Sequence, residues 1–269
     1  MADELLRNIG RARVYDLGHP YWAGMPLHPA DPPFQYYLYR YHEHTKKLFE
    51  SMAPGFSDSI GLVVTSMHSG THFDAPIHMA RDLKVQGQDI TRYEQDKGYV
   101  DLPEKIQSID KVPPLVKKGV LLDIAGYKKT EPLPERYEIT PEDLQGAADG
   151  AQIRIGEGDC VLIRTGYSRL FNTDADGYLH RFAGLGPDAT RWLAKMKVGL
   201  VGIDNLAAGV MPKHFEVQNI ILSDNGIFLM KSLNLEELAR DKKYTSVVIV
   251  APLKIKGAEA SLVRPIAIA

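Results

Sequence analysis

Four short runs of apolar residues stand out along the chain. The residues in each run are almost continuously apolar, which is typical of strands in a sheet covered on both faces. A shorter candidate strand spans 13–17, and a β-rich run at 60–67 ends at His68, where we expect a further buried strand. The four apolar runs are 119–124, 160–163, 198–203 and 246–250.

Two helix starts are marked by residues that favour a first turn. Thr140 precedes Pro141 and two acidic residues, as an N-cap precedes the first helical positions. Pro187 begins a second helix, in which apolar residues recur at helical spacing and Trp192 is expected to pack in the core. Asn234 is expected to cap a short third helix. Together these elements predict a mixed α/β or α+β fold, formed as one domain over residues 1–269.

The stretch 27–57 is rich in Tyr, His and Pro and predicts an irregular excursion. Its tyrosines cluster at 36–41, and Trp22 lies shortly before it. Aromatic side chains beside a polar centre fit a planar substrate, and they fit a subunit interface equally well. Both interpretations stay open at this stage.

Composition excludes several classes of function. The chain has 269 residues, 44% of them hydrophobic and 25% charged, and its net charge is -2. These values are those of an ordinary globular protein, and they argue against binding nucleic acid or a membrane through bulk positive charge. Cys160 is the single cysteine and lies in an apolar run, so we expect a buried and unreactive thiol.

The first eleven residues are charged and lack the apolar core of a secretory signal. No apolar run approaches the roughly 18 residues that a membrane helix needs. The sequence therefore predicts a soluble, cytoplasmic protein whose partner is a small-molecule substrate.

Three of the nine histidines fall between His68 and His78, together with Asp74. Imidazole and carboxylate groups are common ligands of Zn²⁺, Mn²⁺ and Fe²⁺. Residues two apart in an extended segment face the same side, so His72 and Asp74 are placed to hold one ion together. The alternative is a group of surface histidines in a loop. This density of candidate ligands favours the metal site.

The segment His68-x-Gly-Thr-His72-x-Asp74-x-Pro-x-His78 resembles, position for position, the HxGTHxDxPxH motif of the cyclase family of metal-dependent hydrolases. That family includes isatin hydrolase and bacterial kynurenine formamidases. The likeness extends along most of the chain, through segments at 16–20, 163–166, 202–204 and 251–257. It implies a single-domain, cyclase-like swivelling β/β/α fold, and a homodimer or homotetramer.

The resemblance also implies roles for individual residues. The metal ligands would be His68, His72 and Asp74, with Gln218 as a further ligand, and His78 would be the general base or proton shuttle. The alternative for His78 is a third or fourth metal ligand. The residues expected at the substrate are Trp22, Phe73 and His214.

Two-metal members of the family use a downstream Glu at the point where this chain has Lys231. An ammonium group has no lone pair for a metal. The resemblance therefore implies one divalent ion per subunit, Mn²⁺ or Zn²⁺, and two functions for Lys231 stay open: pairing with a carboxylate of the substrate or product inside the pocket, or an ordinary solvated position.

A cation held by two imidazoles and a carboxylate activates water and polarises a carbonyl oxygen. The predicted reaction is hydrolysis of a C–N or C–O bond in a small amide, cyclic imide or lactone. Two alternatives are a two-metal arylformamidase and a catalytically inactive binding module.

Overall fold

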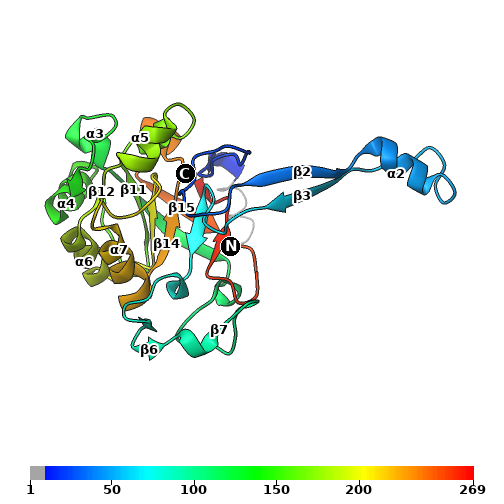
Figure 1. Cartoon of the computed structure of the whole chain (residues 1–269). Helices are drawn as coiled ribbons and strands as arrows, with labels where there is room; N and C mark the ends of the chain where they lie inside the picture. Colours follow the sequence, from blue (N-terminus) through cyan, green and yellow to red (C-terminus); the bar gives the residue numbers. More distant parts are fainter. Residues whose placement is uncertain (1–9) are drawn as a thin grey trace.

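The computed structural model describes residues 10–269, so nearly all of the charged amino-terminal segment lies outside the described residues. A nine-stranded sheet runs through the molecule, in the order β1-β17-β15-β9-β11-β13-β14-β4-β16 (Figure 1). Among residues 10–269, no helix combines the length and the apolar character needed to cross a membrane.

The centre of the sheet is parallel, and both of its flanks are antiparallel. The parallel strands are β9 (Leu115–Asp123), β11 (Cys160–Arg164), β13 (Leu200–Ile203) and β14 (Phe228–Lys231). One flank contains β15 (Thr245–Val250), β17 (Ile266–Ile268) and β1 (Val14–Asp16). The other flank contains β4 (His72–Asp74) and β16 (Ala260–Leu262).

Both faces of the parallel centre are buried, as the apolar runs at 119–124, 160–163 and 198–203 predict, whereas β15 alternates buried and exposed residues, so the expected cover on both faces was wrong for the run at 246–250. Alternate residues of a strand point to opposite faces, and in β11 Val161 and Ile163 join one core cluster while Cys160 and Leu162 join the other. The expectation of a buried Cys160 is confirmed, and burial raises the pKa of its thiol. Trp192 packs against the first cluster, as expected.

Helices of the body pack on the sheet, and the three that the sequence predicts begin close to their expected positions. Thr140 forms a capping box with Asp143. Asn234 accepts a hydrogen bond from the backbone N–H of Glu236, the first helical residue of α8. The helices are α2 (His42–Phe49), α3 (Ile124–Lys128), α4 (Pro141–Gly150), α5 (Ala175–His180), α6 (Pro187–Lys195), α7 (His214–Gln218) and α8 (Glu236–Arg240), and a π-helical segment (Asn219–Asp224) follows α7 directly.

Short elements complete the fold outside the large sheet. Four 3-10 turns lie at Thr91–Tyr93, Ile109–Lys111, Tyr167–Leu170 and Pro76–His78. The small paired strands are β5 (Lys84–Val85) with β6 (Gln88–Asp89), β7 (Glu94–Gln95) with β8 (Gly98–Tyr99), and β10 (Glu138–Ile139) with β12 (Gly184–Leu185).

The segment between residues 35 and 64 is a projecting arm, and it corrects two sequence predictions. β2 (Gln35–Arg40) and β3 (Ile60–Val64) form an antiparallel hairpin that extends away from the body and carries α2 at its far end (Figure 1). The prediction of an irregular excursion at 27–57 was therefore wrong over β2 and α2. The expected burial of the strand after residue 60 was wrong too, because every residue of β3 is exposed.

Candidate metal centre

Strand β4 positions the candidate site. It lies between β14 and β16, with His72 opposite both Lys231 and Leu262. Gly70 allows the chain to turn immediately before the strand, because its φ of 51° is a left-handed conformation that residues with a Cβ atom rarely adopt. That turn brings His68 back over the end of β4.

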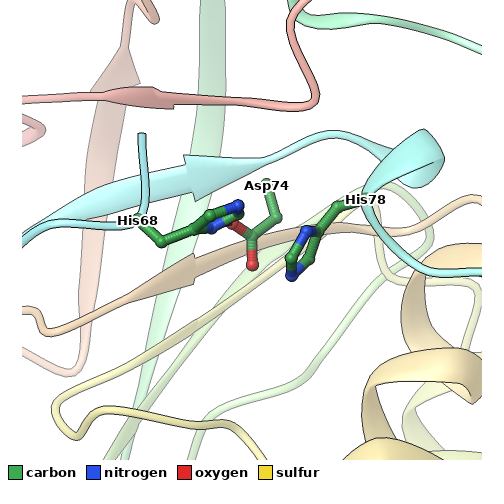
Figure 2. A group of neighbouring side chains, drawn as sticks. All are labelled: His68, Asp74 and His78. Carbon is green, nitrogen blue, oxygen red and sulfur yellow. Dashed lines mark hydrogen bonds and ion pairs between the residues drawn. The ribbon is translucent and has the colours of Figure 1, made fainter. Parts of the chain in front are cut away.

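His68, Asp74 and His78 form a compact group. One potential ligand atom from each lies within 4.8 Å of the others. Figure 2 shows the three side chains converging from the loop before β4, from β4 itself and from the 3-10 turn that begins at Pro76. His68 Nδ1 lies 3.0 Å from Asp74 Oδ1, and the rings of His68 and His78 are 4.1 Å apart. The structure thus brings the predicted proton shuttle within reach of the same ion as the predicted ligands.

His72 is fully buried beside this group. Its Nδ1 donates a hydrogen bond to the carbonyl oxygen of Gly70 at 2.7 Å, so Nε2 carries the free lone pair of the neutral ring. That Nε2 has no hydrogen-bond partner and lies 3.5 Å from Asp74 Oδ1. A buried polar atom left unpaired costs about 1–3 kcal/mol, and a metal ion held with Asp74 would remove that cost. The residues present therefore fit a divalent cation.

The second oxygen of Asp74, Oδ2, faces the positively charged side chain of Lys231. Lys231 Nζ lies 2.9 Å from Asp74 Oδ2 and donates to Gln218 Oε1 at 3.3 Å. Lys231 is buried and lines the same cavity as the histidines, so the solvated alternative was wrong, and the carboxylate that it contacts is Asp74 of the protein itself. Gln218, the expected further metal ligand, contacts the ammonium group instead.

Glu259 is a neighbour that sequence reasoning missed. Its carboxylate lies 3.4 Å from His68 Nε2, so His68 is placed between two carboxylates. Glu259 directly precedes β16, which pairs with β4 although it lies some 190 residues later in the chain. No local pattern could have revealed this contact.

Charge balance around Asp74 keeps it ionised. Burial alone would raise the pKa of this carboxyl, but the Lys231 ammonium group, assisted by the imidazoles, holds it well below its usual range. Asp74 is therefore available as an anionic ligand at neutral pH.

The histidines differ in protonation. Burial lowers the pKa of His68, but hydrogen bonds with Asp74 and Glu259 outweigh it and raise the pKa to about 9. Burial is the largest influence on His72 and His78, and it lowers the pKa of each to about 3. At pH 7 and without metal, His68 is thus an imidazolium ion while the other two rings are neutral.

These residues lie in a cavity of about 850 Å³, which has the size of a site for a small organic molecule. His68, His72 and His78 are among its lining residues, together with Gln218 and Lys231. Its apolar walls are made by Met79, Leu179, Phe182, Leu206, Ala207, Met211 and Phe215. Further polar side chains on its lining are His28, Asp31, Arg136, His180 and His214.

Of the three predicted substrate-binding residues, His214 lines this cavity, and the other two lie elsewhere in the chain. Phe73 is the middle residue of β4, so it points to the face opposite His72 and packs on Phe228 in the core. Trp22 packs edge-on against Phe171 in a separate small cluster. Because side chains alternate along a strand, Phe73 cannot face the cavity while His72 and Asp74 face the metal centre.

Comparisons with known proteins place this geometry in context. A family model described as "Putative cyclase" matches residues 15–210. The chain is 26% identical to isatin hydrolase from Roseibium aggregatum, over 96% of this chain and 92% of the relative. It is 27% identical to kynurenine formamidase from Bordetella petrii, over 94% of this chain and 97% of the relative.

Solved structures share the fold. A crystal structure described as a novel cyclase superposes with a TM-score of 0.86 at 24% identity, covering 99% of this chain and 90% of the other. Isatin hydrolase A from Labrenzia aggregata superposes with a TM-score of 0.75 at 23% identity, covering 100% and 98%. The expected mixed fold of cyclase type is confirmed.

Metal binding should release a proton from His68. Only neutral imidazoles ligate metals, and His68 is the one of the three rings that is protonated at pH 7. Calorimetric titration of the metal-free protein with Mn²⁺, in buffers of different ionisation enthalpy, should report about one proton released per chain at pH 7. The number should fall as the pH rises through the pKa of His68, about 9. Release that stays the same at pH 7 and pH 9 would contradict this assignment.

Proposed function

The chain belongs to the cyclase family, and from that premise we propose that it is a metal-dependent hydrolase that opens a C–N or C–O bond of a small amide, cyclic imide or lactone. The observation that carries the proposal is the convergence of His68, Asp74 and His78 at the wall of a largely apolar cavity, which both histidines line. Relatives named isatin hydrolase and kynurenine formamidase support the amide class of substrate.

In this proposal, His68, His72 and Asp74 hold one divalent ion, Mn²⁺ or Zn²⁺, since imidazoles and a carboxylate suit either. When bound, the ion supplies Lewis acidity, which polarises a carbonyl oxygen and makes water a better nucleophile at neutral pH. The apolar walls orient a planar substrate and exclude bulk water.

His78 carries the proton. Burial keeps its ring neutral at pH 7, so one of the two ring nitrogens is unprotonated and can accept a proton from the attacking water. It lies beside His68 and lines the cavity, so it also reaches a leaving nitrogen or oxygen. Its place in the cluster equally fits the alternative role of a metal ligand, and metal content of a His78 variant separates the two.

Metal removal tests the function. We expect the metal-free protein, prepared by chelation, to lose hydrolysis of a panel of isatin, N-formylkynurenine and a small lactone, and to regain it with Mn²⁺ or Zn²⁺. Product formation is followed by absorbance. Turnover that survives complete chelation, or a reloaded protein that hydrolyses none of the panel, would count against the proposal and favour a binding module.

Replacing the proton carrier should separate chemistry from metal binding. His78→Gln should lower kcat by about 10²- to 10⁴-fold, because general acid–base catalysis is worth that much, while bound metal measured by mass spectrometry stays at the wild-type level. Lys195→Gln, an exposed position on α6, is the control and should leave both values unchanged. A His78→Gln protein that loses its metal would assign His78 as a ligand.

We also propose that the β2–β3 arm assembles the protein with a second copy. An isolated two-stranded hairpin is marginally stable in water at best, yet four apolar residues of β3 are between 43% and 49% exposed. The arm projects beyond the body that would otherwise cover it (Figure 1). A two-fold arrangement would let each copy cover the arm of the other, and this use favours the interface interpretation of the tyrosines at 36–41.

A charged substitution on the arm should therefore split the assembly. Val63→Asp should lower the molar mass measured by light scattering after size exclusion toward 30.0 kDa, the mass of one chain. The matched control is Leu83→Asp, which changes an exposed apolar residue outside the arm and should keep the wild-type mass. A wild-type protein that already elutes as a monomer would contradict the arm's role.

A further inference from the structure

The two oxygens of Asp74 face different groups. Oδ1 faces the imidazoles, with His68 Nδ1 at 3.0 Å and His72 Nε2 at 3.5 Å. Oδ2 faces Lys231 Nζ at 2.9 Å. A carboxylate placed this way is able to bridge two cations, one on each oxygen, as in two-metal sites whose ions lie about 3.5–4 Å apart. Here the second position is taken by an ammonium group.

Lys231 is held firmly in that position. Its residue is 6% exposed, and it lies at the end of β14 in register with His72 of β4. The next residue, Ser232, is fixed on three sides: its N–H donates to the carbonyl oxygen of Asn205, its carbonyl oxygen accepts from Thr71, and its hydroxyl accepts from Tyr178. The backbone therefore gives the ammonium group little freedom to leave Asp74.

The oxygen that would complete a second cation site is also occupied. Gln218 Oε1 is buried and accepts a hydrogen bond from the same ammonium group at 3.3 Å. Lys231 thus binds both oxygens on this side of the cluster, and it contributes one positive charge where a second metal would contribute two.

The balance of buried charges at the site also favours one divalent ion over two. The carboxylates that contact the cluster are Asp74 and Glu259, which supply two negative charges. One divalent ion and the ammonium group bring three positive charges, a small excess in a buried site. A second divalent ion would bring five, and uncompensated buried charge is costly.

We propose that Lys231 is a built-in second cation: it restricts the centre to one divalent ion and competes with that ion for the charge of Asp74. The inference rests on the proposed metal site, and it deepens it by assigning a positioning residue that sets the number and affinity of the ions. Lys231 acts through Asp74 and Gln218, and its role is read out in metal binding independently of turnover.

Three variants test it. Lys231→Met removes the charge and keeps most of the side-chain volume. Lys231→Glu replaces the ammonium group with a ligand oxygen. Lys195→Met makes the first change at an exposed position on α6 and serves as the matched control. Each protein is stripped of metal, checked for a cooperative thermal transition, and titrated calorimetrically with Mn²⁺, with bound metal counted by mass spectrometry.

The wild type and Lys195→Met should bind one Mn²⁺ per chain. Lys231→Met should bind its first ion about tenfold more tightly or better, because a like charge a few ångströms away is gone and Asp74 is relieved of its competitor. A purely structural lysine would have the opposite effect, since its loss would loosen Asp74 and weaken binding. Lys231→Glu should bind close to two ions, whose magnetic coupling gives a distinct electron paramagnetic resonance spectrum.

The proposal is overturned by a wild type that binds two ions, by a Lys231→Met protein that binds Mn²⁺ no more tightly than the wild type, or by a folded Lys231→Glu protein that still binds one. If Lys231→Glu shows no cooperative thermal transition and is therefore not folded, the affinity of Lys231→Met for Mn²⁺ decides whether the proposal holds. Two bound ions together with hydrolysis would reject the role of Lys231 and keep the enzyme. One bound ion without hydrolysis of any panel substrate would keep the role of Lys231 and reject the proposed enzyme activity.

Discussion

Asp74 has no solvent exposure, and a carboxylate in that position exists as an anion only if positive charge surrounds it. Lys231 supplies that charge on one side, and the protonated His68 supplies it on the other when no metal is bound. The proton on His68 and the metal are thus alternatives beside the same oxygen, whereas the charge of Lys231 is permanent. The chemistry of the centre follows from this division between an exchangeable cation and a fixed one.

The fold surrounds Asp74 with charged side chains by placing the three-residue strand β4 between β14 and β16. β4 alternates strictly, so Phe73 anchors the strand in the core while His72 and Asp74 face the centre. β14 on one side brings Lys231, and the residue before β16 on the other brings Glu259. Apolar side chains around the cavity keep the local dielectric low, which strengthens each of these charge interactions.

Much of the fold and of the site can be predicted from the sequence. The contacts that depend on pairing between strands far apart in the chain cannot. The strands at 160–163 and 246–250 and the cap at Thr140 are local signals, and they are confirmed. The dense run of ligands from His68 to His78 is local as well. Glu259 has no local signal, since its place follows from strand pairing. The strand after residue 60 was wrongly predicted to be buried, because apolar residues on an exposed arm have the same sequence pattern as those in a core.

The pairing of β4 also has a consequence for the order of events during synthesis. Its hydrogen-bonding partners are residues 229–231 and 260–262, which leave the ribosome long after residues 72–74. Contacts so far apart in sequence form late. A nascent chain thus holds His72 and Asp74 without these neighbours until residues 260–262 have been synthesised, so the buried centre forms only after that point.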